Sequence, residues 1–440
     1  MGSYVPATEA DRAAMLAQLG LSSLDDLYAA VAPEVRIDAL DLPAGKSELE
    51  VMELLGELAA KNTVFTSVFR GAGAYRHYIP AIVRTVTSKE KFYTAYTPYQ
   101  AEISQGVLQS IFEYQTQVCE LFGMDVSNAS VYDGATAAAE GVLMCQDRKR
   151  TGVIMAGTTD LQAMRVIRTY CGSRNVPVYS LGPEEGLAIS LDALRAKLAE
   201  TNAACVYIQS PNFFGVIEDV ESIVAIAHEA RAKVVMSANP ISLGLLKTPG
   251  EYGVDVAVAE GQPLGLPLSY GGPYLGIMCC TKALMRKLPG RIVGQTTDAK
   301  GQRCFVLTLQ AREQHIRREK ASSNICSNEA LCAMTASVYM AAMGSAGLHD
   351  VALNSASNAH YLAQQLSAIE GFELMTDKPF FHEFMMTCPM DHDEFVEQLA
   401  QRGFLAGLPA QGGILWCCTE LNYKARVDAL VAAVKEVCAR

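Results

Sequence analysis

The residues from 259 to 277 have the types and spacing of a loop that surrounds an enzyme cofactor. They read AEGQPLGLPLSYGGPYLGI, with Gln262 near the start, several prolines and a pair of glycines between two apolar runs. Such a loop is typical of enzymes that hold pyridoxal phosphate (PLP), in which a lysine amine forms a Schiff base with the cofactor. No lysine lies between Lys247 and Lys282. Because the amide of Gln262 cannot form a Schiff base, the loop lacks the group that this chemistry needs.

Two further parts of a PLP site can be sought in the sequence. The stretch YDGATAAAEG (132–141) places a turn at Asp133–Gly134 before an alanine-rich helix. Its N-terminus could bind a phosphate, or it could be an ordinary capped helix end. An acid that pairs with the pyridine nitrogen is expected at the end of the strand 233–239, but Met236 and Ser237 stand there. The residues alone therefore predict a PLP-type fold without PLP chemistry of its own.

The alternative is a self-sufficient PLP enzyme that uses Lys247 or Lys282. Lys247 follows a different strand, and Lys282 lies in TKALMRKLPGR, a pattern typical of a surface helix. Neither lysine has the surroundings of a Schiff-base lysine. Replacing each by alanine distinguishes the two hypotheses, because only this alternative predicts a loss of activity.

The elements that must position the loop are short apolar runs that alternate with helical patterns between about residues 100 and 325. Strands that are apolar throughout are covered on both faces, which indicates a mainly parallel sheet in an α/β domain. The helical patterns include SLDALRAKLAE and VESIVAIAHEARA. The predicted strands are 152–157, 176–182, 204–210, 233–239, 255–261 and 274–280.

The sequence divides into three regions. Residues 1–90 contain capped helical patterns, at 8–20, 23–32 and 47–62, and predict an N-terminal helical arm. Residues 91–345 form the large α/β domain, whose last helix begins near Asn328. Residues 346–440 alternate strand and helix patterns and predict a small C-terminal α+β domain. This architecture matches that of type I PLP enzymes, which is an analogy of fold and carries no function by itself.

The composition favours a soluble enzyme or enzyme subunit. The chain has 440 residues and a net charge of -11, which argues against nucleic-acid binding because that needs a basic face. Its 13 cysteines form no CxxC pair, so we expect reduced, buried thiols and no metal site. We also expect no membrane-spanning stretch of about 18 uncharged apolar residues and no signal peptide. These expectations together predict a cytoplasmic protein.

Four segments carry a resemblance to a known family, namely 68–83, 92–141, 269–278 and 286–331. The last and most specific reads RKLPGRIVGQTTDAKGQRCFVLTLQAREQHIRREKASSNICSNEAL. Together they resemble the P-protein of the glycine cleavage system over essentially the whole chain, and most closely the alpha subunit (subunit 1) of its two-subunit form. The resemblance implies the type I PLP-dependent transferase fold, which is like that of aspartate aminotransferase.

The resemblance also implies a function. The complex, a glycine dehydrogenase (aminomethyl-transferring, decarboxylating), removes the carboxylate of glycine as CO2 and transfers the aminomethyl group to the lipoyl arm of the H-protein. In the two-subunit form the beta subunit carries PLP on a lysine in a motif like HKTFxxPHGGGGP. When Pro267 and Pro273 are matched to that motif, Gln262 falls on the lysine and Met236 on the pyridinium acid. The resemblance thus implies a subunit without PLP of its own, inactive alone, in a heterotetramer with the beta subunit.

Sites of this fold class form at subunit interfaces, so exposed polar and aromatic residues of the loop 92–105 are candidates for a shared site. They are Tyr96, Tyr99, Gln100 and Glu102. The alternative is that this loop only packs against the partner. His77 is a further candidate, and its alternative is a purely structural histidine.

The basic run AREQHIRREK (311–320) has two interpretations. It is either a solvated helix face with pairs such as Glu313 with Arg317, or a contact for the acidic H-protein or the partner subunit. A further hypothesis for the whole chain is a structural or regulatory protein that only stabilises the beta subunit.

Overall fold

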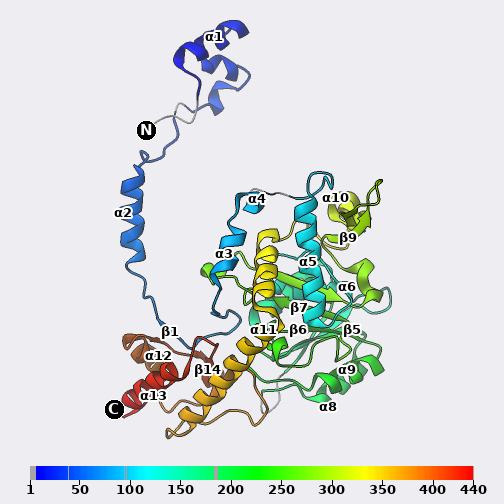
Figure 1. Cartoon of the computed structure of the whole chain (residues 1–440), viewed down its shortest axis with the longest axis vertical. Coiled ribbons are helices and arrows are strands. Elements are labelled where there is room, and N and C mark those ends of the chain that lie inside the picture. Colours follow the sequence, from blue (N-terminus) through cyan, green and yellow to red (C-terminus); the bar gives the residue numbers. More distant parts are fainter. Residues whose placement is uncertain (1–5, 38, 94, 96, 183–186, 440) are drawn as a thin grey trace. The chain divides into compact units, whose positions relative to one another are not determined.

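The computed structural model describes residues 6–37, 39–93, 95, 97–182 and 187–439 (Figure 1). The chain forms two compact units, Met1–Val64 and Phe65–Arg440. The first unit thus ends at Val64, whereas the sequence patterns place the end of the arm at residue 90.

The first unit is built of short helices whose caps the sequence predicts. α1 (Glu9–Leu19) begins after Thr8, whose side chain accepts a hydrogen bond from the Asp11 N–H, and ends at Gly20 in the left-handed conformation. α2 (Glu48–Ala59) begins in the same way after Ser47. The pattern at 23–32 forms 3-10 helices, Leu24–Tyr28 and Pro33–Val35, in place of an α-helix. None of the described residues in this unit is buried.

The second unit contains a seven-stranded sheet in the order β2-β8-β7-β6-β5-β3-β4. The strands from β7 to β4 run parallel, while β8 is antiparallel to both β7 and β2. The expected mainly parallel sheet and its six predicted strands are confirmed. The strands are β2 (Val126–Ser127), β3 (Gly152–Ala156), β4 (Val178–Leu181), β5 (Ala203–Gln209), β6 (Lys233–Ser237), β7 (Val256–Glu260) and β8 (Gly276–Cys280).

Helices cover both faces of this sheet, which explains why its strands are apolar throughout. Ile154, Val206 and Val234 pack in one core, and Val153, Cys205 and Val235, their neighbours along the strands, pack in the other. α5 (Gln105–Phe122), α8 (Leu191–Glu200), α9 (Val220–Glu229) and α11 (Ala330–Ser367) contribute to the first core. α6 (Gly134–Met144) and α7 (Leu161–Ser173) contribute to the second.

α11 corrects one expectation about membrane spans. Residues 330–348 carry no charged side chain, and among the described residues this is one helix that is long and apolar enough to cross a membrane. However, α11 packs along α5 and α3 (Ala81–Thr87), as Figure 1 shows, and its Ala336 and Tyr339 lie in the core. Burial accounts for the apolar composition of residues 332–340, whereas residues 341–347 are exposed or half-buried. The helix is kinked at Gly344, where φ is 61°, close to the domain boundary expected at residue 345.

The C-terminal residues form a three-stranded antiparallel sheet in the order β11-β14-β13 with two helices. β12 of this region pairs in parallel with β1, so the chain that leaves the first unit is anchored here. The elements are β1 (Ser67–Val68), β11 (Glu383–Met386), β12 (Phe404–Leu405), β13 (Leu408–Ala410), β14 (Gly413–Cys417), α12 (His392–Gln401) and α13 (Lys424–Cys438). The remaining described α-helices and strands are α4 (Glu90–Tyr93), α10 (Gln314–Arg317) and the hairpin β9 (Ile292–Thr297) with β10 (Arg303–Thr308).

Candidate functional site

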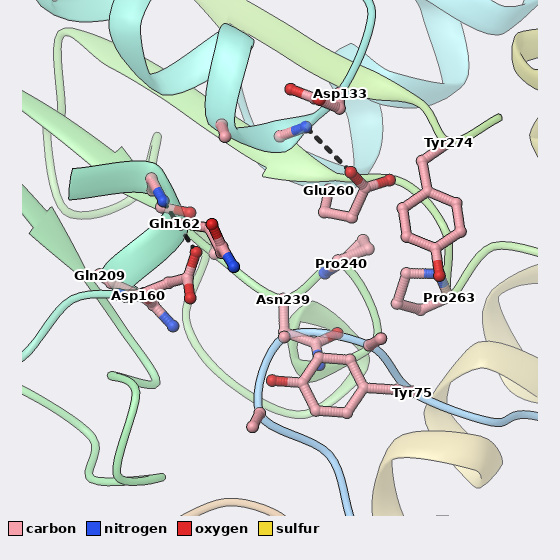
Figure 2. Close-up of a pocket in the computed structure, with 18 of the residues that line it drawn as sticks. Tyr75, Asp133, Asp160, Gln162, Gln209, Asn239, Pro240, Glu260, Pro263 and Tyr274 are labelled. Atoms are coloured by element: carbon pink, nitrogen blue, oxygen red, sulfur yellow. Dashed lines mark hydrogen bonds between the residues drawn. The ribbon is translucent and has the colours of Figure 1, made fainter. Parts of the chain in front are cut away.

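A cavity of about 470 Å³ lies at the carboxyl ends of the parallel strands (Figure 2). Gln209, Ser237 and Glu260 reach it from the ends of β5, β6 and β7. Asp133 and Asp160 reach it from the N-termini of α6 and α7. Crevices at this edge of an open α/β sheet are the usual ligand sites of such folds. The loop 259–277 and the helix start at 133–134, both singled out by their sequence, therefore do meet in one cavity.

The N-terminus of α6 is occupied by a carboxylate of the chain itself. Glu260 Oε2 accepts a hydrogen bond of 2.9 Å from the Gly134 N–H, drawn as the dashed line that ends at Glu260 in Figure 2. Asp133 caps the same helix and accepts a 2.7 Å bond from the Thr136 N–H. Any Cβ at position 134 would lie 2.8 Å from the Glu260 backbone nitrogen, so only glycine allows this approach. Two acidic side chains thus stand where a helix end would otherwise attract a phosphate.

Glu260 is held by three backbone donors. Its Oε1 accepts bonds from the N–H groups of Gln262 (2.9 Å) and Leu275 (3.0 Å), in addition to the bond from Gly134 to Oε2. Burial raises the pKa of Glu260 to about 7, although these three hydrogen bonds oppose the rise. Glu260 therefore links the start of α6 to both ends of the loop that follows β7.

Gln262, at the position matched to the lysine, is buried and joins two distant segments of the chain by hydrogen bonds. These bonds are called the Gln262 clamp below. Its Oε1 accepts a 2.9 Å bond from the Tyr75 N–H, and its Nε2 donates 2.9 Å bonds to the carbonyl oxygens of Tyr75 and Leu266. The side chain is 1% exposed. The amide uses its acceptor and both donor hydrogens, a pattern that the ammonium group of a lysine cannot reproduce because it has no acceptor.

The clamp holds the segment 71–78 against the C-terminal domain. Within this segment, the Tyr75 hydroxyl donates a 2.7 Å bond to Glu383 Oε2, and the Ala72 N–H donates a 2.7 Å bond to Glu383 Oε1. Burial raises the pKa of Glu383 to about 7, against the effect of these two bonds. The chain of contacts from Gln262 through Tyr75 to Glu383 joins the large domain to β11.

His77 has a structural environment. Its Nδ1 lies 2.7 Å from Glu420 Oε2, and the side chain is almost fully buried. Burial opposes ionisation of Glu420, but hydrogen bonds from His77 and Tyr78 leave its pKa lowered. Burial also lowers the pKa of the neighbouring His382 to about 3. The structure therefore favours the structural alternative for His77 over a side chain that reaches into a partner.

The structure also places the other residues that the sequence analysis compared with a PLP site. Met236 is buried in the core, and Asn239 lines the cavity after β6. Lys247 lies outside the cavity lining, 3.5 Å from Glu221 and over the ring of Tyr252. Lys282 is exposed at the start of a 3-10 helix. Neither lysine is placed to serve the cavity.

The residues of this cavity do not fit PLP. The lysine position holds an amide that is fully hydrogen-bonded, and the phosphate position at α6 holds Glu260. The described lining includes the carboxylates Asp133, Asp160 and Glu260 but no lysine or arginine, so a phosphate would meet like charge. Among the described residues, no group of three or more His, Cys, Asp and Glu side chains could hold a metal ion.

The interface candidates lie on a different part of the second unit. Tyr99, Gln100 and Glu102 are exposed, whereas Tyr96 lies outside the described residues. The Tyr99 hydroxyl accepts a 3.0 Å bond from Nη2 of Arg291, and its ring centroid lies 5.9 Å from that of His315. The loop 92–105 and the basic run 311–320, which are separate in the sequence, therefore come together here.

The helical interpretation of the basic run is wrong. A 3-10 turn (Gln310–Arg312), α10 and a second 3-10 turn (Arg318–Lys320) follow one another, and Arg318 has a φ of 54°. Glu313 is buried and lies 3.6 Å from Nδ1 of His315, not against Arg317. Tertiary contacts override helix propensity here, because the Arg312 guanidinium bonds to the carbonyls of Leu288 and Gly290.

Sequence reasoning missed Glu260, Tyr75, Glu383 and Arg291. Only Glu260 has a local signal, because it ends the predicted strand 255–261 two residues before Gln262. An acid at a strand end beside a candidate cofactor loop is worth noting on that ground alone. The other residues act through partners far away in the chain.

Comparison with known proteins places this site in context. The model of the glycine cleavage system P-protein family matches residues 2–434. A protein of Moorella thermoacetica named probable glycine dehydrogenase (decarboxylating) subunit 1 is 47% identical over 446 residues, which cover 99% of this chain and 100% of that protein. A protein of Chlorobium luteolum with the same name is 47% identical over 443 residues, 99% of each chain.

Solved structures agree in fold. A crystal structure of glycine decarboxylase (P-protein) of the glycine cleavage system, in inhibitor-bound form, superposes with a TM-score of 0.92 at 42% identity and covers 99% of this chain and 100% of that chain. An alanine–glyoxylate aminotransferase from Nostoc superposes with a TM-score of 0.61 at 15% identity over 92% of this chain and 98% of its own. The second likeness shows the fold alone. The expected type I PLP-dependent transferase fold is confirmed.

Proposed function

The chain belongs to the glycine cleavage system P-protein family, and we propose that it is the subunit of a two-subunit glycine dehydrogenase (decarboxylating) that carries no PLP. Its relatives are named subunit 1 of that enzyme, and they match over nearly their full length. The observation that carries the proposal is the Gln262 clamp. At the position of the Schiff-base lysine it places a buried amide whose oxygen and both N–H hydrogens are hydrogen-bonded within the chain. A partner, the beta subunit, then supplies PLP.

The proposed reaction of the complex is the decarboxylation of glycine. The carboxylate leaves as CO2, and the aminomethyl group passes to the lipoyl arm of the H-protein. PLP on the beta subunit supplies the electron sink for this step. The chain described here shapes the shared pocket and excludes water from it. We propose a cytoplasmic heterotetramer, with neither nucleic acid nor a membrane among its partners.

The first unit supports the need for a partner. Its described residues bury no side chain, and α2 exposes Leu49, Met52, Leu55 and Leu58. Isolated helices of this length are marginal in water, and a row of exposed apolar side chains is typical of an interaction surface. An arm that folds on a second subunit accounts for both features.

The proposal is tested on the purified chain and on the reconstituted complex. Alone, the chain should show no aldimine absorbance with added PLP and should not exchange bicarbonate into glycine. It should co-purify with a PLP-containing partner of similar size. A borohydride-reducible PLP adduct on any lysine of the isolated chain would overturn the proposal, and the variants Lys247→Ala and Lys282→Ala should leave the activity of the complex unchanged.

The second candidate function is a scaffold that only stabilises the beta subunit. It is favoured by the burial of His77 and by a cavity whose residues do not fit PLP. Substitution of the candidates Tyr96, Tyr99, Gln100 and Glu102 in the reconstituted complex separates the two functions. At a protein concentration that keeps the complex assembled, changed turnover supports a shared pocket, and unchanged turnover for all four variants supports the scaffold.

A further inference from the structure

We propose that the Tyr99 hydroxyl is an oriented hydrogen-bond donor for a carboxylate or phosphate of the partner subunit, and that Arg291 positions it. The proposal rests on the proposed function, because it concerns the surface at which the partner would contribute. It assigns Arg291 as a positioning residue and gives Tyr99 a defined chemical role.

The hydrogen bond between Tyr99 and Arg291 has a defined polarity. A guanidinium carries donors only, so the Tyr99 oxygen must be the acceptor in its 3.0 Å contact with Arg291 Nη2. The phenol has one proton left, and no hydrogen bond among the described residues uses it. The side chain is 51% exposed. Its remaining proton is therefore available to an acceptor on another molecule.

No carboxylate that the structure describes compensates the charge of Arg291. Arg291 is 2% exposed, yet no carboxylate among the described residues forms an ion pair with it. Its Nε has no hydrogen-bond partner, and its Nη1 only reaches Asn328 Oδ1 at 3.4 Å. Burying a cation is costly unless an anion compensates it. An anion that accepts a hydrogen bond from the Tyr99 hydroxyl would compensate the charge of Arg291, with that hydroxyl lying between the two charges.

Both side chains are held in place. The backbone around Arg291 is fixed, because its carbonyl accepts a 2.7 Å bond from the Ala129 N–H. Asn328 Nδ2 also bonds to the Ala129 carbonyl at 3.3 Å. The guanidinium carbon lies 5.2 Å from the centroid of the Tyr99 ring, which holds the ring by a cation–π contact. A donor held in this way loses little conformational entropy on binding.

The surroundings favour an anion over a cation. Residues 310–320 contain four lysines and arginines and two glutamates, so their net charge is 4 − 2 = +2 with histidine neutral. One of the glutamates, Glu313, is buried beside His315. The run that brings His315 to the Tyr99 ring is therefore cationic overall.

The chain offers a matched control in Tyr423. It is 54% exposed and has Arg426 over its ring at 4.9 Å, much as Tyr99 has Arg291. However, Nη1 of Arg426 donates to the Leu421 carbonyl instead of to the Tyr423 hydroxyl. Tyr423→Phe therefore removes an exposed phenol hydroxyl beside an arginine without removing an oriented donor.

The experiment measures the dissociation constant between this chain and the beta subunit, with and without the partner's PLP. Tyr99→Phe and Arg291→Met should each weaken assembly on the order of 10- to 100-fold, the effect of losing a hydrogen bond to a charged group. The double variant should be no weaker than Tyr99→Phe within about twofold, because Arg291 acts through Tyr99. Tyr423→Phe should match the wild type.

The two forms of the partner identify the anion. A loss only with the PLP-loaded partner assigns a phosphate, and an equal loss with the PLP-free partner assigns a carboxylate of the partner chain. If Tyr99→Phe binds both forms of the partner as tightly as the wild type does, the inference is overturned. That outcome is decisive even if Arg291→Met fails to fold, because Tyr99 is a surface residue. If the wild type itself does not assemble with a PLP-bearing partner, it is the proposed function that fails.

Discussion

Replacing Gln262 by leucine tests whether the lysine position has become a structural clamp. Leucine has a similar size but can neither donate nor accept a hydrogen bond. The change removes three bonds of 2.9 Å and leaves the Tyr75 N–H, the Tyr75 carbonyl and the Leu266 carbonyl without this partner in a buried place.

The magnitude follows from these three groups. Each unsatisfied buried group costs about 1–3 kcal/mol. Burial of the apolar leucine side chain returns about 1.5–3 kcal/mol. We therefore expect Gln262→Leu to lower the free energy of unfolding by about 3 kcal/mol. Stability should also fall locally, because Tyr75 and its neighbours lose their hydrogen bonds to the loop after β7.

Urea denaturation followed by the fluorescence of Trp416 provides the global measurement. Trp416 is the one tryptophan of the sequence and is buried in the C-terminal domain. Hydrogen exchange of the Tyr75 amide provides the local measurement and should become faster. Gln162→Leu is the matched control, because Gln162 lines the cavity but is exposed, and it should change stability by less than about 0.5 kcal/mol. A Gln262→Leu protein as stable as this control, with unchanged exchange at Tyr75, would refute the clamp.

Three other predictions concern the isolated chain. Burial raises the pKa of Glu383 from 4.5 to about 7, so the native state binds this proton more tightly than the unfolded chain. The contribution of Glu383 to the free energy of unfolding should therefore fall as pH rises from about 4.5 to 7. Glu383→Gln should remove up to about 3 kcal/mol of that fall, and an unchanged pH slope would contradict the assignment. Asp133→Ala should cost about 1 kcal/mol in urea unfolding, because it removes the cap of α6. A thiol reagent should modify Cys326 first, because Cys326 is exposed, whereas burial raises the pKa of Cys280 to about 12. An initial rate of thiol modification that Cys326→Ser leaves unchanged would contradict this.

The secondary structure could be predicted where it depends on local pattern. The strands β3 to β8 can be recognised from their own apolar residues. Helix caps can be recognised locally as well, because Thr8, Ser47 and Asp133 bond to backbone groups three residues away. The loop after β7 is also recognisable, because Gln262 interrupts an otherwise suitable cofactor sequence. These features need no knowledge of the rest of the chain.

The site itself could not be predicted, because its contacts are between distant residues. Gln262 and Tyr75 are 187 residues apart, and Glu260 and Gly134 are 126 apart. Nothing beside Arg291 in the sequence indicates that its guanidinium meets Tyr99, 192 residues away. The helix predicted for the run 311–320 was wrong for the same reason. Its backbone conformation depends on the contacts of Arg312 with the carbonyls of Leu288 and Gly290, and not on its helix-forming composition.

A lysine placed at position 262 would not by itself create a PLP site, because other positions also lack the groups that PLP needs. It could donate to the carbonyls of Tyr75 and Leu266, but it would leave the Tyr75 N–H unpaired, since an ammonium has no acceptor. The Glu260 carboxylate would still fill the N-terminus of α6, and Met236 would still offer no acid. These three residues also stabilise the chain. Gln262 does so through its bonds to Tyr75 and Leu266, Glu260 through its bond to the start of α6, and Met236 through core packing. The proposed function accounts for these internal contacts, because a partner subunit that binds PLP leaves this cavity without that role.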